Sequence, residues 1–305
     1  MALQKNPKSY GAWSHRAWAM AAFPNMDWDR ELRLCNLLLE QDERNFNGWD
    51  YRRLVCQHAK VTLEKELSFT MDKIAANFSN YSAWHYRSSL LPKVHPGSRE
   101  GTVKEDVLLE EYSLVQNATF TDPGDQSGWF YHSCELSAAR TSVLEKELEV
   151  CQALHELEPQ NKWPLLTCVL LMRALDGSGF REGIEKFLVE LLTIDPMRSA
   201  FYQDLKSKFV MEIALEGLDV NVERVSFAGK ELTCVYHADH LALVRDVDLS
   251  GNRIRSLRSL CFLHGVVRLD LSGNRVLTCL GLEELPHLEW LSLKDNGILL
   301  GPATV

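Results

Sequence analysis

The stretch NFSNYSAWHYRSS, residues 77–89, leads from a turn-forming segment into a helix that carries Trp84 and Arg87 three residues apart. Similar wording occurs twice before it, as NPKSYGAWSHRAW at residues 6–18 and as NFNGWDYRRL at residues 45–54. We call these stretches Trp motifs, and we add QSGWFYHS and NKWPLLT, so that the motif residues are Trp13, Trp49, Trp84, Trp129 and Trp163. Spacings close to 35 residues are typical of helical hairpins that stack into a solenoid.

The segments between the Trp motifs read as amphipathic helices. In DRELRLCNLLLEQD, Leu34, Leu37 and Leu38 lie at the i, i+3, i+4 positions of one helix face. Four later segments repeat this pattern, and one longer interval contains a Pro- and Gly-rich insertion at residues 92–101. The sequence therefore predicts a mostly α fold, with an α-solenoid of helical hairpins over residues 1–217.

A second repeat, of different length, begins near residue 222. VERVSFAGKEL, VRDVDLSGNRI, VVRLDLSGNRV and LEWLSLKDNGI align without a gap, and each begins 22 residues after the last; they place Lys230, Asn252, Asn274 and Asn296 at one position. The pattern is the leucine-rich L-x-L-x-x-N-x-L, in which a short strand precedes an Asn that hydrogen-bonds the turning backbone. We predict a small α/β leucine-rich repeat domain over residues 218–305, with its C-terminal cap missing.

Composition narrows the class of protein. The net charge of -9, without a Lys/Arg cluster, disfavours nucleic acid as a partner. The longest apolar run, LLTCVLLM, is far shorter than a membrane span, and the N-terminus has no signal-peptide core. Eight scattered cysteines fit reduced thiols. We expect a cytoplasmic protein.

The motif residues have a structural interpretation and an interface interpretation. Trp can fill the gap between hairpins, and an Asn such as Asn6, Asn45 or Asn77 suits a helix N-cap. The Arg of each motif can serve packing or can face a partner, and the residues alone do not decide between the two. The candidate partner-facing residues are Arg16, Asn45, Arg52, Asn77, Tyr81 and Arg87.

No catalytic set is recognisable in the sequence. CxxC, HExxH, a P-loop and a G-x-G-x-x-G are all absent. The cluster Cys234, His237, Asp239 and His240 resembles a metal site, but ordinary core and surface positions explain it better. We expect no metal in this chain, and we expect the chain alone to be inactive.

The Trp motifs resemble the repeats of the protein prenyltransferase α-subunit family, whose signature is an Asn- or Pro-led turn, Tyr, and then W-x-x-R. A leucine-rich domain after the hairpins marks the Rab geranylgeranyltransferase (type II) branch of that family. The resemblance covers nearly the whole chain. It implies one half of a heterodimer that transfers geranylgeranyl from geranylgeranyl diphosphate to C-terminal cysteines of Rab GTPases presented by an escort protein.

The same resemblance assigns the chemistry. It implies that the catalytic zinc belongs to the β subunit, and that Lys8 and Tyr10 of NPKSY approach the isoprenoid diphosphate. A cation and a phenolic donor can stabilise charge on a departing diphosphate. On the residues alone, Lys8 would be a solvated turn residue and Tyr10 would pack under Trp13.

The chain departs from the family in several places. It starts directly before the first motif and ends soon after the last repeat, so we expect truncation at both ends. Trp129 and Trp163 are too close for the immunoglobulin-like domain of mammalian members, and residues 133–135 read as a direct join. His132 stands where Arg is expected, and Asn47 stands where His is common. The alternative function is a non-catalytic interaction scaffold built from both repeats.

Overall fold

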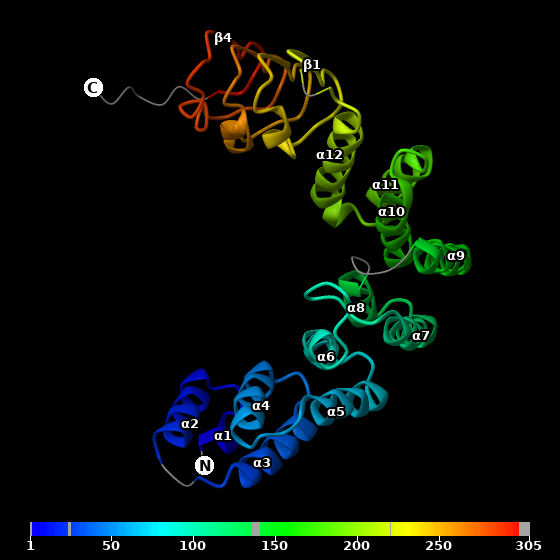
Figure 1. The fold of residues 1–305 in the computed structure, drawn as a ribbon, viewed down its shortest axis with the longest axis vertical. Coiled ribbons are helices and arrows are strands. Elements are labelled where there is room, and N and C mark those ends of the chain that lie inside the picture. The colour runs from blue at the N-terminus through cyan, green and yellow to red at the C-terminus, as the bar shows by residue number, and fades with distance from the viewer. Residues whose placement is uncertain (1, 24–25, 136–140, 220, 299–305) are drawn as a thin grey trace. The chain divides into compact units, whose positions relative to one another are not determined.

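The computed structural model describes residues 2–23, 26–135, 141–219 and 221–298 (Figure 1). The chain divides into two compact units. The first unit spans residues 1–150 and the second spans residues 151–305. The division falls inside a helix, and each unit is described by itself. Among the described residues, no helix combines the length and the hydropathy that crossing a lipid bilayer requires.

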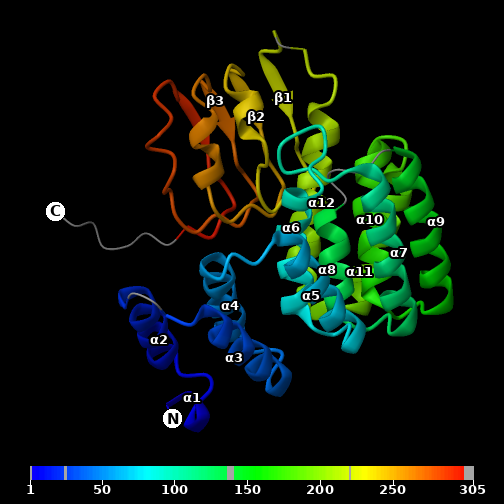
Figure 2. The ribbon, with the colours of Figure 1, turned by 60° about the horizontal axis from the view of Figure 1, so that its bottom comes forward.

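The first unit consists of helices that pack in consecutive pairs, as the Trp motifs predict (Figure 2). The pairs are α3 with α4, α5 with α6 and α7 with α8. The helix bounds are α1 Ala2–Lys5, α2 Tyr10–Ala22, α3 Trp28–Gln41, α4 Phe46–His58, α5 Leu63–Ala76, α6 Tyr81–Val94, α7 Glu105–Thr121, α8 Gln126–Glu135 and α9 Thr141–Leu157. The mostly α fold with helical-hairpin repeats is confirmed.

Buried Trp side chains connect neighbouring hairpins. Trp49 and Trp84 lie in one hydrophobic cluster with residues of three successive helix pairs, and each is 1% exposed. Trp13 lies in a second cluster and packs against Tyr51 of the next motif, with ring centroids 5.4 Å apart. A hairpin therefore borrows part of its core from its neighbour, as in other solenoids.

The helices that carry the first three motif Trp residues, α2, α4 and α6, each begin at a side-chain cap. Ser9, Asn45 and Asn80 each accept a hydrogen bond from the backbone N–H three residues ahead. The predicted cap at Asn45 is therefore confirmed. The caps predicted at Asn6 and Asn77 are wrong, because both residues lie three positions too early and bond the amide two residues ahead within the turn.

The second unit starts with the rest of α9 and continues with α10 Lys162–Asp176, α11 Arg181–Ile194, the short 3-10 helix η2 Pro196–Arg198 and α12 Ser199–Leu215. The fifth Trp motif has a different register from the others. Its cap is Asn161, and a step of four residues, as from Asn45 to Trp49, leads to Leu165, which is fully buried. Trp163 lies only half-buried in the first turn. Assigning Trp163 to the repeated Trp position was wrong, because Leu165 fills that position.

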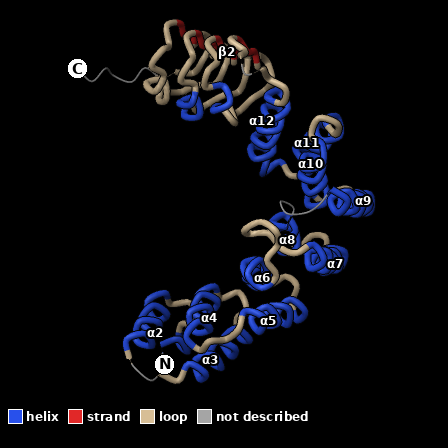
Figure 3. Tube along the Cα trace, in the orientation of Figure 1, coloured by secondary structure: helices blue, strands red, loops and turns tan. Residues whose placement is uncertain are grey.

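After α12 the described part of the chain forms four parallel strands in the order β1-β2-β3-β4. They are β1 Arg224–Ser226, β2 Asp246–Asp248, β3 Arg268–Asp270 and β4 Trp290–Ser292, with 3-10 helices η3 Ala238–Leu241 and η4 Arg258–Phe262 on the return paths (Figure 3). The strand register pairs residues 22 positions apart, for example Val225 with Val247 and Val247 with Leu269. The 22-residue period of the sequence is thus the step from one coil to the next.

Asparagine side chains tie each coil to the one before it. The Asn252 amide group donates to the carbonyls of Phe227 and Leu249, at 2.9 and 2.8 Å, and its oxygen accepts from the Leu232 N–H. Asn274 and Asn296 make the same three contacts one and two coils later. This is the role that the leucine-rich pattern predicts for the Asn.

Helix α12 and the first coil share one core. Met211 of α12 is fully buried in the same cluster as Phe227 and Leu232. The change from helix to strand occurs between Leu215 and Arg224, yet the packing has no break there. The boundary at 217/218 is therefore a change of repeat type, while the compact units divide at 150/151.

Candidate functional site

The indole of each of the first four motif Trp residues closes the turn that precedes it. Its Nε1–H donates to the backbone carbonyl six residues earlier. The bonds are Trp13 to Pro7 at 2.6 Å, Trp49 to Glu43 at 2.8 Å, Trp84 to Phe78 at 2.7 Å and Trp129 to Pro123 at 3.0 Å. The Trp residues therefore hold the turns, one of which carries Lys8, in a fixed position against their helices.

The motif arginines form ion pairs inside the chain. Each guanidinium makes two bonds to a Glu of the following hairpin. The pairs are Arg16–Glu31, Arg52–Glu66 and Arg87–Glu111, with N–O distances of 2.5 to 2.9 Å. Arg52 and Arg87 are 3% and 8% exposed, so they lie in the interior and not on an open face. The geometry gives them the packing role, and contact with a partner stays a prediction.

A Tyr from the next Trp motif completes two of these pairs. The Tyr51 hydroxyl donates to Glu31 at 2.7 Å, and the Tyr131 hydroxyl donates to Glu111 at 2.5 Å. Burial and the Glu31 carboxylate raise the pKa of Tyr51 above its usual range. Burial opposes ionisation of Glu31, but bonds from Arg16 and Tyr51 outweigh it and lower the pKa of this carboxyl.

The fourth motif uses a different pair at this place. His132, which stands where Arg is expected, lies 3.0 Å from Glu147 through Nε2 and is 2% exposed. Sequence reasoning missed all four Glu partners. A signal was present, because Glu31, Glu66 and Glu147 each follow the motif Arg or His by 14 or 15 residues.

The predicted diphosphate contacts, Lys8 and Tyr10, lie at the surface of the first unit. The Lys8 side chain is 70% exposed and its Nζ lies 3.3 Å from the Asp42 carboxylate. Tyr10 is the first residue of α2, is 67% exposed, and packs against Phe46 with ring centroids 5.5 Å apart. Tyr10 thus does not pack under Trp13.

Two helix N-termini meet beside Lys8. Phe46 is the first residue of α4, and the Asn45 side-chain amide donates to the Pro7 carbonyl at 2.8 Å. That carbonyl also accepts from Trp13, so the turn before α2 is held against the start of α4. Helix N-termini carry partial positive charge, and with the Lys8 ammonium they favour an anion. The Asp42 carboxylate opposes it.

The remaining predicted site residues belong to the next turn. Tyr81 begins α6, is 51% exposed, and lies against His85 and Phe130, with centroids 6.0 Å apart in each case. The Asn77 amide donates to the Glu43 side chain. The structure therefore brings Lys8, Tyr10 and Asn45 together, and it places Tyr81 and Asn77 one hairpin further along.

Asn47, at the second position of α4, is 8% exposed, and its side-chain Nδ2 has no hydrogen-bond partner among the described residues. This is the position at which the prenyltransferase resemblance leads one to expect His. Burying an amide without a partner costs stability. This unsatisfied donor lies in the first turn of α4, the helix whose N-terminus lies beside Lys8.

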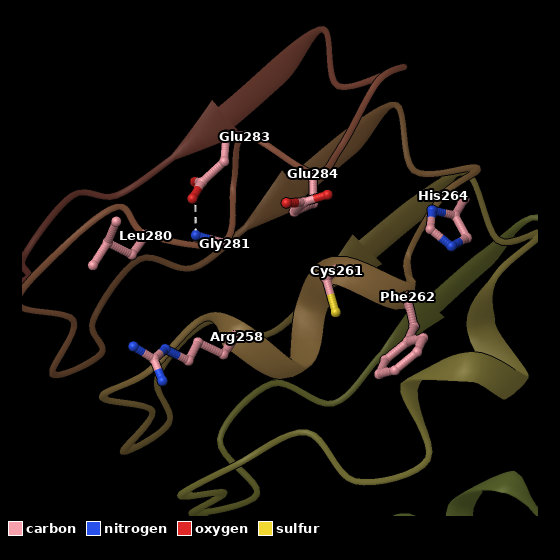
Figure 4. Close-up of a pocket in the computed structure, with 8 residues that line it drawn as sticks. All are labelled: Arg258, Cys261, Phe262, His264, Leu280, Gly281, Glu283 and Glu284. Carbon is pink, nitrogen blue, oxygen red and sulfur yellow. Dashed lines mark hydrogen bonds between the residues drawn. The ribbon is translucent and has the colours of Figure 1, made fainter.

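The second unit has a surface hollow of about 460 Å³ on the side of η4 (Figure 4). Cys261, His264 and Glu284 line it with Phe262, and the Glu283 carboxylate bonds the Gly281 N–H at 2.7 Å. Within the described part of the chain, no three His, Cys, Asp or Glu side chains could hold a metal ion together. The His, Cys, Asp and Glu side chains of the described residues therefore do not fit a zinc site.

Comparison with known proteins identifies the family. The family model described as protein prenyltransferase alpha subunit repeat matches residues 1–23, 28–59 and 63–94, which are the segments of the first three Trp motifs. The pig (Sus scrofa) protein named geranylgeranyl transferase type-2 subunit alpha is 35% identical over 96% of this chain and 74% of its own length. The chain belongs to the geranylgeranyl transferase type-2 α-subunit family.

A second relative in this family, from Dictyostelium discoideum, carries the same name and is 39% identical over 68% of this chain and 67% of its own length. A solved chain titled Candida albicans protein geranylgeranyltransferase-I complexed with GGPP matches 68% of this chain and 81% of its own, with a TM-score of 0.47 and 16% identity.

The alignment with the pig member runs over 419 residues, more than the 305 of this chain. The pig protein therefore has residues inside the aligned region that this chain lacks, as expected for a missing inserted domain. The expected join lies at residues 133–135, and residues 136–140, which follow it, lie outside the described residues.

Proposed function

We propose that this chain is the α subunit of a heterodimeric geranylgeranyl transferase that modifies C-terminal cysteines of Rab GTPases, with an escort protein presenting the substrate. Its membership of the type-2 α-subunit family carries the proposal. The geometry that supports it is the meeting of the N-termini of α2 and α4 beside Lys8 and Tyr10. Both of these side chains are exposed on the first unit.

The chemistry of that surface suits a diphosphate. In prenyl transfer, a cysteine thiolate attacks the first carbon of the isoprenoid while the bond to the diphosphate oxygen breaks. The leaving group gains negative charge in the transition state, where an ammonium and a phenolic O–H stabilise it. We assign these roles to Lys8 and Tyr10, with the N–H groups of the first turn of α2 nearby.

The thiolate requires a different part of the enzyme. We propose that zinc, which lowers the pKa of a bound cysteine thiol, is held by the β subunit. Buried thiols of this chain are unsuited to react, because burial raises the pKa of Cys35 to about 12.

Exposed aromatic side chains of the first unit favour a partner there. Phe46 and Phe130 are 49% and 44% exposed, beside the exposed Tyr10 and Tyr81. Exposed aromatics of this kind are enriched at protein interfaces. We propose that they contact the β subunit. We also infer a cytosolic location, since the seven cysteines whose side chains the structure describes are all free thiols.

Co-expression with a cognate β subunit tests the proposal. A stable 1:1 complex that transfers labelled geranylgeranyl to a Rab protein, with escort protein and zinc present, is the expected result. The alternative is a non-catalytic scaffold. It would be supported if the folded chain, with an unchanged helical circular dichroism spectrum, remained separate from β during size-exclusion chromatography and transferred nothing.

A further inference from the structure

One outward-facing residue from each strand forms a continuous row across the sheet of the second unit. The row consists of Arg224, Asp246, Arg268 and Trp290, which the strand register pairs one with the next. The alternate strand residues Val247 and Leu269 are fully buried on the other side. We call these four residues the charged row.

The charged row is incompletely neutralised. The same Asp246 oxygen lies 3.6 Å from Arg224 Nε and 3.8 Å from Arg268 Nε. Both distances exceed those of a good hydrogen bond, and one carboxylate serves two guanidinium groups. The side chains of Arg224 and Arg268 are 82% and 52% exposed. The row therefore has one net positive charge, with guanidinium donors available to carboxylates from outside.

Trp290 closes the row at the last described strand. It is 40% exposed, and the Arg268 guanidinium lies 4.4 Å from its ring centroid. Trp and Arg are the residue types that dominate binding energy at protein interfaces. An exposed Trp beside a partly neutralised Arg is thus a suitable anchor for another protein.

The row of residues next to the charged row, on the same face of the sheet, has short side chains and so does not obstruct a bulky partner. Its members are Ser226, Asp248, Asp270 and Ser292, all with short side chains. The Asp248 and Asp270 carboxylates accept from the N–H groups of Ser250 and Ser272, at 3.0 and 2.8 Å, and so lie close to the backbone. Their negative charge favours basic side chains in the part of a partner that lies over this row, and leaves acidic side chains only the positions over Arg224 and Arg268.

The spacing of the charged row selects the kind of partner. Neighbouring strands are about 4.8 Å apart. Successive turns of an α-helix rise about 5.4 Å. A helix that crosses the strands therefore places one residue of a single face over each strand, at i, i+4, i+7 and i+11. The mismatch of about 2 Å over three strands is within the reach of Arg and Glu side chains.

We propose that the charged row is a docking surface for an α-helix of a partner protein, with an acidic residue at i, a basic residue at i+4, an acidic residue at i+7 and an apolar residue at i+11. The acidic residues pair with Arg224 and Arg268, the basic residue with Asp246, and the apolar residue with Trp290.

A charge-swap experiment on the full chain tests this docking surface. Two labelled helical peptides have the stripe Glu, Lys, Glu, Leu or the stripe Lys, Glu, Lys, Leu on one face, with identical residues elsewhere. Fluorescence anisotropy at low ionic strength measures their binding. We expect the first peptide to bind more tightly by about tenfold, and added salt to reduce the difference.

The variant Arg224→Glu/Arg268→Glu combined with Asp246→Lys should reverse this preference, and Trp290→Ala should weaken both peptides. Arg275→Glu changes an exposed Arg of the same coils that lies outside the charged row, and it should leave the preference unchanged. Thermal unfolding confirms that each variant is folded. The proposal is overturned if neither peptide binds the wild-type chain, or if the folded triple variant keeps the wild-type preference.

Discussion

At the scale of single residues, the buried Arg–Glu pairs and the exposed Lys8–Asp42 pair differ in how far water reaches them. Glu66 and Arg52 are 2% and 3% exposed, so their charges are compensated only by each other and by near neighbours. Lys8 and Asp42 form a pair that water reaches, since the Lys8 side chain is 70% exposed. Buried pairs are costly to break singly, while an exposed pair exchanges partners easily.

Glu66→Gln should destabilise the folded chain by about 3 kcal/mol, because it leaves the buried Arg52 charge without its carboxylate. Chemical denaturation measures the loss. Glu185→Gln is the matched control, since Glu185 pairs with Arg181 at the surface and should change stability by less than about 1 kcal/mol. Equal effects for the two variants would contradict the buried role of the pair.

Glu31 should make stability depend on acidity. Its pKa is lower in the folded state than its usual value near 4.5, so its stabilising contribution is complete above that value. The contribution is lost as the pH falls through the folded pKa. Glu31→Gln should therefore unfold with a flatter pH dependence below about pH 4.5 than the wild-type chain. An unchanged profile would argue against the bonds to Arg16 and Tyr51.

Lys8→Ala should slow prenyl transfer by the assembled heterodimer by about tenfold or more, because a cation at the leaving group is lost. Affinity for the β subunit should change less. Lys5→Ala removes an exposed lysine of α1 and serves as the control. Turnover equal to the wild type would remove Lys8 from the active site, whatever the affinity for β.

Asp42→Asn should strengthen the binding of the diphosphate, the opposite of the effect of Lys8→Ala. The change removes a negative charge 3.3 Å from Lys8 Nζ, while Asn can still accept from the Arg44 N–H as Asp42 does. We expect a lower KM for geranylgeranyl diphosphate and little change in stability. A higher KM would indicate that Asp42 orients Lys8 productively.

At the scale of elements, one geometry recurs in each type of repeat and positions its turns. In the hairpins it is the Trp indole bound to the turn carbonyl six residues earlier. In the coils it is the Asn amide that bonds carbonyls of its own coil and of the one before. Both satisfy backbone groups that a turn would otherwise leave buried without partners.

Asn274→Ala should destabilise the second unit by about 2–3 kcal/mol, since it leaves buried backbone groups of two coils without hydrogen-bond partners. Lys230→Ala changes the same register position in the first coil, where the side chain is exposed, and should have little effect. Hydrogen exchange of the amides between residues 249 and 276 locates the loss. Similar hydrogen exchange in both variants would contradict this role of the Asn side chains.

At the scale of the whole molecule, the two repeat types are joined by packing and not by a linker. Met211 of α12 lies in the core of the coils, so a chain ending at residue 217 would expose that face. We expect such a truncated chain to aggregate. Met211→Lys in the truncated chain should improve its solubility, as sedimentation measures. A soluble, monomeric chain 1–217 without that change would show that 217/218 is an independent domain boundary.

The sequence by itself determined the two periods, near 35 and equal to 22, and hence the hairpins, the coils and the family. Repeats repeat their local contacts, so motif spacing is enough to predict them. The matching of Lys8 and Tyr10 to diphosphate contacts stays a prediction. Trp163 was misassigned because Trp identity was followed where the helix cap, Asn161, sets the register.

Only the tertiary structure decided what each polar side chain faces. Arg87 could have met a partner or a carboxylate of its own chain, and Glu111, 24 residues away, is the one it meets. The charged row likewise depends on strands 22 residues apart in the sequence lying side by side. Charge is a long-range property of assembled surfaces, and the order of residues along a chain does not state which ones become neighbours in space.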